Sequence, residues 1–445
     1  MPLRLQVRQW PADDFGARGP PTGSLRDPHV ADNVRDRQRD DLPRLPAPNR
    51  QKARDWKSEN ERDNGTTGRV EGRAVKRDDL DRLLHDLADV GGSDLHLKSG
   101  APPRWRVNGV LSTLEGPRLT PKDTFELAAA IMPANIREIF EAKHEADFAY
   151  AVQGLGRFRV NVFRQRGSVA LAMRLVHTNP STVAELGLPD VVQRLADERR
   201  GLVLLTGPTG SGKTTTLAAM VNHINHTRAC HIITIEDPIE YLHVDDLAAI
   251  EQREVGFDTE SFTSAMRVVL RQDPDVILVG EMRDPETVYT ALTAAETGHL
   301  VLSTLHTRTA TETINRVVDF FRADEQEQVR VSLSAGLVGT ICQRLIPRAD
   351  GCGRVPAAEI MVVNGRIQEA ILDPLKTSQI DQIIAEGEYY GMQSFDQSVA
   401  GLMRSGMIEL REAMNAASNP HDLKIMLERM GVLTTGHAGA VLAAS

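Results

Sequence analysis

The stretch Gly201-Leu-Val-Leu-Leu-Thr-Gly-Pro-Thr-Gly-Ser-Gly-Lys-Thr-Thr-Thr216 decides the fold of this chain. Residues 202–205 are continuously apolar, which is typical of a buried strand, and the residues after 215 can continue as a helix. Between them, residues 207–214 match the pattern Gly-x4-Gly-Lys-Thr of a phosphate-binding loop, placed between strand and helix as that loop requires. The sequence therefore predicts a site for a nucleoside triphosphate.

Each position of this loop has a physical role. Glycines let backbone N–H groups curl around phosphate oxygens without a Cβ clash, and the start of the following helix adds a favourable dipole. Lys213 is expected to reach the β- and γ-phosphates of ATP, and the Thr214 hydroxyl to bind Mg²⁺. The alternative is an ordinary turn of a β-α unit. The expected nucleotide-binding residues are Gly207, Pro208, Thr209, Gly210, Ser211, Gly212, Lys213, Thr214 and Thr215.

The composition is that of an ordinary globular protein. The chain has 445 residues, of which 41% are hydrophobic and 25% charged, enough for two or three domains. No apolar stretch is long enough for a membrane span and the first residues lack the apolar core of a secretory signal, so we expect a cytoplasmic protein. A net charge of −9 gives no general attraction to nucleic acid. The three cysteines predict neither a disulfide framework nor a paired-CxxC zinc site.

The chain divides into stretches of different character. Residues 1–75 are rich in Arg, Asp, Pro and Gly and lack periodicity, which predicts a disordered extension. An arginine-rich arm for a polyanion is the alternative, weakened by the interleaved aspartates. Residues 76–180 mix helical and strand periodicity and predict a smaller α+β domain. We expect a linker over 181–200, the nucleotide-binding domain over 201–428 and a flexible tail over 429–445.

The nucleotide-binding domain alternates short apolar strands with helices. Strands are expected at 202–205, 231–235, 276–279 and 299–305, and continuous apolar strands of this kind form a mostly parallel sheet buried on both faces. After about residue 310 the pattern is helical apart from a strand-like piece at 357–363. The expected class is therefore α/β, with a helical C-terminal part.

Acidic residues follow two of these strands. Glu236 stands at the end of the second expected strand and Glu281 just after the third, so both fall on the sheet edge that carries the phosphate loop. Hydrolysis of a phosphoanhydride needs one carboxylate to orient or deprotonate water and another to hold Mg²⁺, directly or through water. The alternative is that these two carboxylates only cap helices or lie in solvated loops. An aspartate is usual where Gly280 stands, which leaves Glu281 to serve the metal.

A histidine and several arginines complete the candidate set. His306 follows the strand at 299–305 and could sense the γ-phosphate, whereas the role of His299 stays open. Arg159 and Arg174, with Arg157 nearby, stand in strands of the first domain. Arginines of this kind can clamp a transition state when a neighbouring subunit delivers them, and solvent-facing strand arginines are the alternative.

Four segments together resemble one known family. Residues 207–214, 234–240, 273–284 and 297–307 are similar to the Walker A, aspartate, Walker B and histidine boxes of secretion and type IV pilus ATPases. Further stretches, among them Ser93-Asp-Leu-His-Leu97, Arg157-Phe-Arg-Val-Asn161 and Tyr390-Gly-Met-Gln-Ser-Phe-Asp396, are similar to the pilus retraction (twitching-motility) branch. The resemblance covers about residues 76–428.

The resemblance implies a RecA-like ATPase domain, a PAS-like N-terminal domain and a homohexameric ring. ATP would lie between the domains, and its hydrolysis would move them and extract pilin through the platform protein at the inner face of the cytoplasmic membrane. By motif position, Glu236 corresponds to the catalytic carboxylate, Glu281 to the Walker B metal helper and His306 to the histidine-box residue. Arg159 and Arg174 correspond to fingers that act across the ring.

The function within this family stays open between several alternatives. Retraction ATPases share an Ala-Ile-Arg-Asn-Leu-Ile segment, and this chain has Arg366-Ile-Gln-Glu-Ala-Ile371 instead, which leaves pilus assembly, type II secretion or a non-catalytic accessory ring subunit as alternatives. The chain lacks the four-cysteine zinc motif typical of the extension and secretion branch, which favours retraction. A nucleic-acid translocase would need a basic or aromatic track, and aromatic residues are only 4% of the chain.

Overall fold

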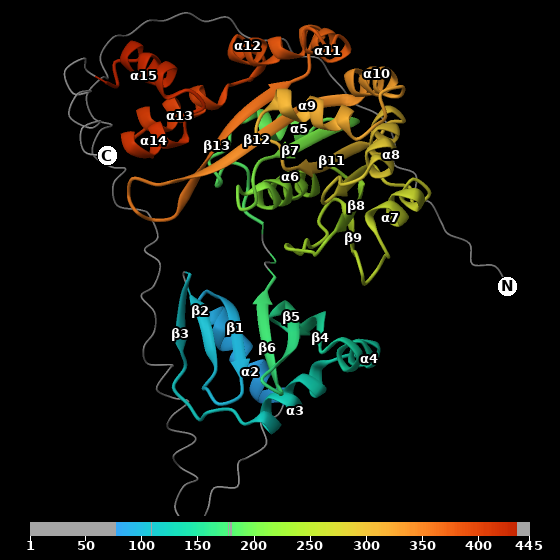
Figure 1. Cartoon of the computed structure of the whole chain (residues 1–445), viewed down its shortest axis with the longest axis vertical. Helices are drawn as coiled ribbons and strands as arrows, with labels where there is room; N and C mark the ends of the chain where they lie inside the picture. Colours follow the sequence, from blue (N-terminus) through green and yellow to red (C-terminus); the bar gives the residue numbers. More distant parts are fainter. Residues whose placement is uncertain (1–76, 108, 177, 179, 434–445) are drawn as a thin grey trace, which may run out of the picture. The chain divides into compact units, whose positions relative to one another are not determined.

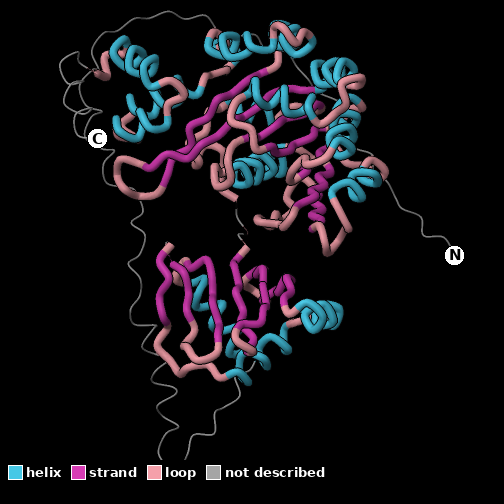
Figure 2. The backbone as a smooth tube through the Cα atoms, in the orientation of Figure 1, coloured by secondary structure: helices cyan, strands magenta, loops and turns pink. Residues whose placement is uncertain are grey.

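A computed structural model describes residues 77–107, 109–176, 178 and 180–433 (Figure 1). The predicted N-terminal extension, 1–75, lies wholly outside the described residues, and so does the predicted C-terminal tail after residue 433. The described residues group as one unit by their contacts. Within the described part there are two sheets, one of six and one of seven strands, which we name the small sheet and the large sheet. Figure 2 shows both with the helices that accompany them.

The small sheet is antiparallel throughout and has the strand order β3-β2-β1-β6-β5-β4. Three helices accompany this antiparallel sheet, one before its first strand and two between β3 and β4, so this part is α+β, as expected. The bounds of its strands and helices are α2 Arg77–Asp89, β1 Gly92–Lys98, β2 Arg104–Val107, β3 Val110–Thr113, α3 Pro121–Ile131, α4 Ala134–Lys143, β4 Glu145–Val152, β5 Gly156–Gln165 and β6 Ser168–Leu175.

Local sequence explains why these elements form where they do. Helix α3 begins with a capping box, in which the Thr120 side chain accepts from the Asp123 backbone and the Asp123 carboxylate accepts from the Thr120 backbone. In α2, Leu80, Leu84 and Leu87 share one face and are fully buried. The helices cover one face of the small sheet, so its strands alternate buried and solvent-facing side chains.

The large sheet has the strand order β13-β12-β7-β11-β10-β8-β9. Every neighbouring pair is parallel except β12 and β13, which are antiparallel. This confirms the α/β class. The strand bounds are β7 Gly201–Thr206, β8 His231–Glu236, β9 Ala249–Glu254, β10 Val276–Val279, β11 Leu300–Leu305, β12 Leu337–Pro347 and β13 Arg354–Val362.

Helices cover both faces of the large sheet. Leu202 and Leu204 of β7 join a core with helices α7 to α12, whereas Val203 and Leu205 join a second core with α5 and α6. A third cluster packs β12 and β13 against α13 to α15. The helix bounds are α5 Val191–Ala196, α6 Lys213–Thr227, α7 Phe262–Val269, α8 Pro285–Glu296, α9 Ala310–Asp319, α10 Gln326–Gly336, α11 Gly365–Leu372, α12 Ile380–Ala385, α13 Phe395–Arg404, α14 Leu410–Ala416 and α15 Pro420–Arg429.

The expectation of an almost wholly helical chain after residue 310 is wrong at one place. Residues 337–347 form the strand β12, which pairs with β7 on one side and with β13 on the other. The apolar residues of this segment fit either a helix or a strand by periodicity alone, and the open edge of β7 decides for the strand. Strand β9 was not expected either, because its sequence, Ala-Ile-Glu-Gln-Arg-Glu, is polar.

The segment predicted as a linker, 181–200, is ordered and contains helix α5. Its apolar side chains, including Val183, Leu188 and Val192, are buried in the core that covers one face of the large sheet. By its packing, this segment therefore belongs to the same domain as the large sheet. Among the described residues no helix is long and apolar enough to cross a membrane.

Candidate functional site

The phosphate loop, residues 207–214, requires its glycines. Gly207, Gly210 and Gly212 have φ values of 139°, 79° and 92°, which L-residues with a Cβ rarely adopt. A Cβ on Gly207 would lie 2.3 Å from the backbone oxygen of Gln343, and one on Gly212 would lie 2.9 Å from the Gln343 Nε2. Strand β12 thus approaches the loop so closely that only glycine fits.

Lys213 is the first residue of α6 and is buried. Its ammonium donates to the backbone oxygens of Gly207 at 2.8 Å and Pro208 at 3.2 Å, so it folds over the mouth of the loop. Burial lowers the pKa of Lys213, and the nearby carboxylates of Glu281 and Glu240 oppose that shift. An anion bound in the loop would satisfy this ammonium better than neutral carbonyl groups do.

The other polar groups of the loop face the start of α6. The Ser211 hydroxyl oxygen is buried without a hydrogen-bond partner among the described residues, and Thr214 is half-buried beside it in the first turn. The Thr215 hydroxyl shares a hydrogen bond of 3.1 Å with the Tyr241 hydroxyl. Pro208, Thr209 and Gly210 are exposed at the tip. The loop and the first turn of α6 thus combine glycines of positive φ, a buried ammonium and one buried hydroxyl without a partner among the described residues.

Glu281 is the carboxylate that the structure brings into the surroundings of Lys213. One of its oxygens lies 3.1 Å from the His306 Nε2, and the other accepts from the Arg283 guanidinium at 2.9 and 3.0 Å. Arg283 also lies 3.8 Å from an oxygen of Asp237. The tips of β8, β10 and β11 therefore carry one connected group of charges, as the sequence predicts for residues beyond the carboxyl ends of parallel strands.

Gly280 has a structural reason to replace the usual aspartate. A Cβ at this position would lie 3.2 Å from the Ile235 oxygen and 3.5 Å from the Glu236 Cα. The Gly280 N–H donates to that same Ile235 oxygen at 2.8 Å, and its own carbonyl accepts from the Thr304 hydroxyl at 2.6 Å. The glycine lets β8 and β10 approach closely at their tips.

Glu236 ends β8, which lies one strand further from the phosphate loop than β10. Its carboxylate accepts from the Thr234 hydroxyl at 2.7 Å and from the Gln252 amide at 3.1 Å. Burial raises the pKa of Glu236, and these hydrogen bonds together with the Glu240 N–H oppose the shift. Glu236 shares the sheet edge with Glu281, but the carboxylates that act on Lys213 are Glu281 and Glu240.

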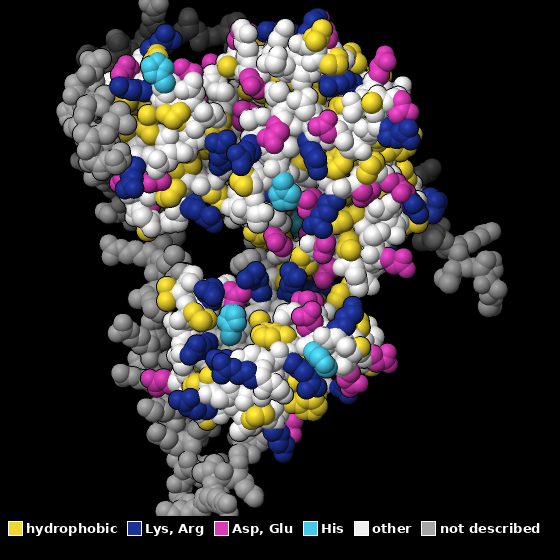
Figure 3. Space-filling model, in the orientation of Figure 1, with side chains coloured by type: hydrophobic (Ala, Val, Ile, Leu, Met, Phe, Trp, Pro, Cys, Tyr) yellow, Lys and Arg dark blue, Asp and Glu magenta, His cyan; other side chains and the backbone are white. Residues whose placement is uncertain are grey.

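Arg159 and Arg174 are cross-strand partners on β5 and β6, on the sheet face away from the helices. The Arg174 guanidinium donates to Asp94 at 2.8 Å. Burial raises the pKa of Asp94, and hydrogen bonds from Ser93 and Arg174 outweigh this, so the pKa is lowered overall. Figure 3 shows Lys and Arg side chains gathered over this part of the molecule.

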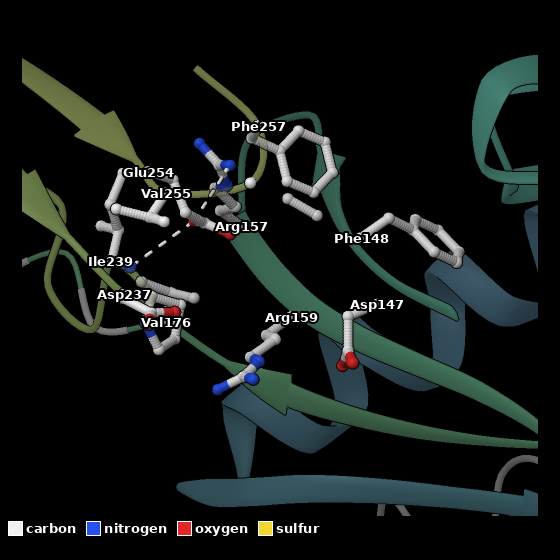
Figure 4. A pocket seen from close by; sticks show the side chains of 13 residues that line it. Asp147, Phe148, Arg157, Arg159, Val176, Asp237, Ile239, Glu254, Val255 and Phe257 are labelled. Carbon is white, nitrogen blue, oxygen red and sulfur yellow. Dashed lines mark hydrogen bonds and ion pairs between the residues drawn. The ribbon is translucent and has the colours of Figure 1, made fainter. Parts of the chain in front are cut away.

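Arg159 lines a pocket of about 270 Å³ that also contains Asp237, the residue after Glu236 (Figure 4). Arg157 and Glu254 line the same pocket and lie 3.5 Å apart. The Glu254 carboxylate also accepts from the Ile239 N–H at 3.5 Å. Residues 237–239, in the acidic loop after β8, therefore share a pocket with Arg159 of the same chain. That Arg159 acts on the site of a neighbouring subunit stays a prediction. Arg174 is not among the pocket-lining residues.

His299 lies away from this group. It directly precedes β11, at the end of the strand opposite to His306, and its ring Nδ1 lies 3.0 Å from the Ala294 oxygen. This supports a structural role. Among the described residues no three His, Cys, Asp or Glu side chains converge as a metal site.

Sequence reasoning gave no role to three residues that contact the predicted site residues. Gln343 of β12 accepts from the Thr216 hydroxyl at 2.9 Å and packs against two loop glycines. Arg283 pairs with Glu281, and Gln252 of β9 holds Glu236. Gln343 lies on a strand that was not predicted, so no signal pointed to it. Gln252 begins the stretch 252–256, which is similar to the pilus retraction branch, but the sequence assigned it no role. Arg283 stands two residues after Glu281 and could have been singled out by that spacing.

Comparisons with known proteins agree with this geometry. The model of the type II/IV secretion system protein family matches residues 70–415. The type IV pilus retraction ATPase PilT of Pseudomonas aeruginosa is 46% identical over 77% of this chain and 99% of its own length. The type IV pilus ATPase PilU of the same organism is 39% identical over 79% of this chain and 91% of its own length.

A solved structure extends the similarity to the fold. The crystal structure of the pilus retraction motor PilT with bound ADP superposes with a TM-score of 0.72 at 47% identity, covering 78% of this chain and 99% of that one. The chain belongs to the type II/IV secretion system protein family, a family of ATPases. Within that family it groups with the pilus retraction ATPases of twitching motility.

Proposed function

We propose that this chain is an ATP-hydrolysing motor that retracts type IV pili. The observation that carries the proposal is the buried Lys213 in a glycine cradle, with Glu281 and His306 on the same sheet edge. The similarity to the Pseudomonas retraction ATPase over nearly all of that protein's length supports retraction rather than assembly of pili.

The loop residues fit a nucleoside triphosphate. The positive φ values of Gly207, Gly210 and Gly212 turn backbone N–H groups toward one space, and the N-terminus of α6 adds positive potential there. Lys213 would exchange the two carbonyl groups that it now contacts for phosphate oxygens. The buried Ser211 hydroxyl would gain a partner in the same step.

The residues also fit Mg²⁺, which needs one or two protein oxygens when phosphates supply further ligands. Thr214 would offer its hydroxyl and Glu281 a carboxylate oxygen, directly or through water. When bound, the metal neutralises charge on the phosphates. Glu281 would first have to leave the Arg283 guanidinium, so this ion pair competes with metal binding.

Glu236 would orient the attacking water. Its carboxylate is held by Thr234 and Gln252, which fixes its direction, and its raised pKa makes it a better proton acceptor than an ordinary glutamate. The water oxygen attacks the γ-phosphorus, its proton passes to Glu236, and the bond to the β-γ bridging oxygen breaks to leave ADP.

His306 and the arginines would respond to the γ-phosphate. His306 now contacts Glu281 and is half-exposed, so it can turn to a phosphate oxygen when Glu281 takes up the metal. Arg159 faces the acidic loop through the pocket and Arg174 lies beside it on the next strand. Both would stabilise negative charge in the transition state, from the same or a neighbouring subunit.

The motor would work as a homohexamer at the inner face of the cytoplasmic membrane, with the platform protein and pilins as partners. Different contacts to ATP and ADP would shift the two domains against each other, which converts hydrolysis into displacement. Assembly, type II secretion and an accessory ring role remain alternatives because of segment 366–371. This segment lies on α11, with Ile367, Ala370 and Ile371 buried and Arg366 paired with Glu386 at 3.1 Å.

Two experiments test the proposal. Purified protein should hydrolyse ATP, and Glu236→Ala should abolish hydrolysis; a chain without turnover would leave only the accessory role. Deleting the gene and imaging surface pili tests the direction. Persistent, unretracted pili would support retraction, and cells without pili would show that the motor assembles them.

A further inference from the structure

We propose that Glu359 is a positioning residue that holds the histidine loop, residues 306–309, in register with the phosphate loop. The inference rests on the proposed role of His306 in hydrolysis. It concerns strands β12 and β13, which contribute none of the catalytic residues assigned above.

The first observation is a buried carboxylate at the start of a helix. Glu359 lies on β13 and its side chain is 7% exposed. Its Oε1 accepts from the Ala310 N–H at 2.8 Å, and Ala310 is the first residue of α9. The N–H groups of a first helical turn lack partners within the helix, and a carboxylate there also interacts favourably with the helix dipole.

This hydrogen bond is close to the chemistry. His306 follows the end of β11, and only the loop 306–309 separates it from Ala310. Thr307 in the same loop shares a buried hydrogen bond of 2.7 Å with the Thr313 hydroxyl. The loop is therefore held by α9 on one side and by β11 on the other. Glu359 fixes the end of α9 on which the loop depends.

The second observation links Glu359 to the phosphate loop. Its register partner across the strand pair is Cys342 of β12, and Cys342 is in turn the partner of Thr206, the last residue of β7. The Cys342 thiol is buried, and it acts on the Glu359 carboxylate by lowering its pKa. The next residue, Gln343, accepts from Thr216 and packs on the loop glycines.

Strand β12 thus contacts the phosphate loop through Gln343, and through Cys342 and its β13 partner Glu359 it is linked to the first residue of α9, directly after the histidine loop. Burial raises the pKa of Glu359 to about 6 and Asp381 of α12 adds to this rise, whereas the hydrogen bond from the Ala310 N–H, the Cys342 thiol and Arg344 oppose it. Strand β12 is stiff, because ladder hydrogen bonds hold it to β13 on one side and to β7 on the other. It therefore sets the distance between the two loops.

The test compares Glu359→Ala, which removes the acceptor for the Ala310 N–H, with Glu359→Gln, which keeps an oxygen there. Glu359→Ala should lower kcat by about tenfold, on the scale of one lost buried hydrogen bond, and leave the KM for ATP unchanged. Glu359→Gln should restore kcat to within about threefold of the original, given the retained bond. Asp350→Asn, in the exposed turn between β12 and β13, is the matched control.

A second measurement separates positioning from mere stability. If Glu359 acts through His306, then adding Glu359→Ala to His306→Ala should lower kcat no further than His306→Ala alone. Multiplying effects in the double variant would overturn the proposal. So would a Glu359→Gln variant as impaired as Glu359→Ala, because charge and not the hydrogen bond would then matter.

Hydrogen exchange keeps the inference testable apart from the proposed function. The Ala310 amide should exchange about tenfold faster in Glu359→Ala than in the original chain, and at the original rate in Glu359→Gln. If the chain shows no turnover at all, the proposed function fails while this exchange result still decides the role of Glu359. Equal exchange in all three proteins would overturn it.

Discussion

The two sheets of this protein place their polar groups in different ways. The large sheet is covered on both faces, so Leu202 to Leu205 of β7 are all buried and its functional groups appear only beyond the strand ends. The small sheet is covered on one face, so Arg159 and Arg174 stand within strands on the other. The arrangement of strands thus decides whether function sits at an edge or on a face.

The difference also explains which side chains are held firmly. Lys213 and Glu281 at the edge of the large sheet are buried or mostly buried and have several partners each. Arg174 on the small sheet has one close partner, Asp94, and its side chain is 70% exposed. We expect substitutions in the large sheet and at its edge to lower turnover or stability more than substitutions on the open face of the small sheet. Four predictions test this expectation, from the largest effect to the smallest.

The largest effect is expected at the edge of the large sheet. Lys213→Ala should lower ATP turnover by at least about a thousandfold, because Lys213 is the buried cation of the phosphate loop and is expected to bind the β- and γ-phosphates. Lys122→Ala, an exposed lysine of α3, is the matched control and should leave turnover unchanged. Steady-state ATPase assays measure both, and similar rates for the two variants would refute the assigned site.

The second prediction concerns stability. Leu204→Ala, in a strand buried on both faces, should destabilise the large sheet by about 2–5 kcal/mol, because it leaves a cavity. Asn161→Ala, on the open face of β5, should cost the small sheet less than about 1 kcal/mol. Amide hydrogen exchange in each sheet under mild denaturant measures the two separately. Equal costs would contradict the comparison.

The third prediction is a pH dependence. The pKa of Glu359 is raised from 4.5 to about 6 by burial in the folded chain. Between these pH values the unfolded chain loses its proton while the folded chain keeps it, so stability falls as the pH rises through this window and stays level above it. The loss should be about 2 kcal/mol relative to Glu359→Gln, which cannot titrate.

Denaturant unfolding of both proteins between pH 4 and pH 8 measures this difference. Glu145→Gln on β4 of the small sheet controls for the simple loss of a carboxylate. A difference between the original chain and Glu359→Gln that does not change with pH would show that Glu359 is not held in the buried state described here.

The smallest effect is expected on the open face. Arg159→Ala should lower kcat by about tenfold, since Arg159 acts at a distance from the phosphate loop through the pocket with Asp237. Arg104→Ala, on β2 of the same sheet, is the matched control outside that pocket. Loss of kcat in Arg104→Ala to the same degree would mean that the whole face, and not Arg159, supports turnover.

The sequence alone predicted the central strands of the large sheet and the phosphate loop that follows one of them. Four expected strands are present as β7, β8, β10 and β11, because continuous apolar runs between helices have few other ways to be buried. The loop pattern predicted the positive-φ glycines and the position of Lys213 for the same local reason: the chain's neighbours in sequence create the geometry. Glu281 and His306 followed from their places at the ends of parallel strands.

Only the tertiary structure decided the rest. It made a strand of residues 337–347, because β7 offered an open edge, and it placed Gln343 against the phosphate loop and Glu359 against the histidine loop. It also ordered Glu281 and Glu236 by their distance from Lys213, which depends on the strand order β7-β11-β10-β8. Local patterns fix turns and strands, whereas contacts between residues distant in sequence depend on which edges and faces the folded chain leaves to be filled.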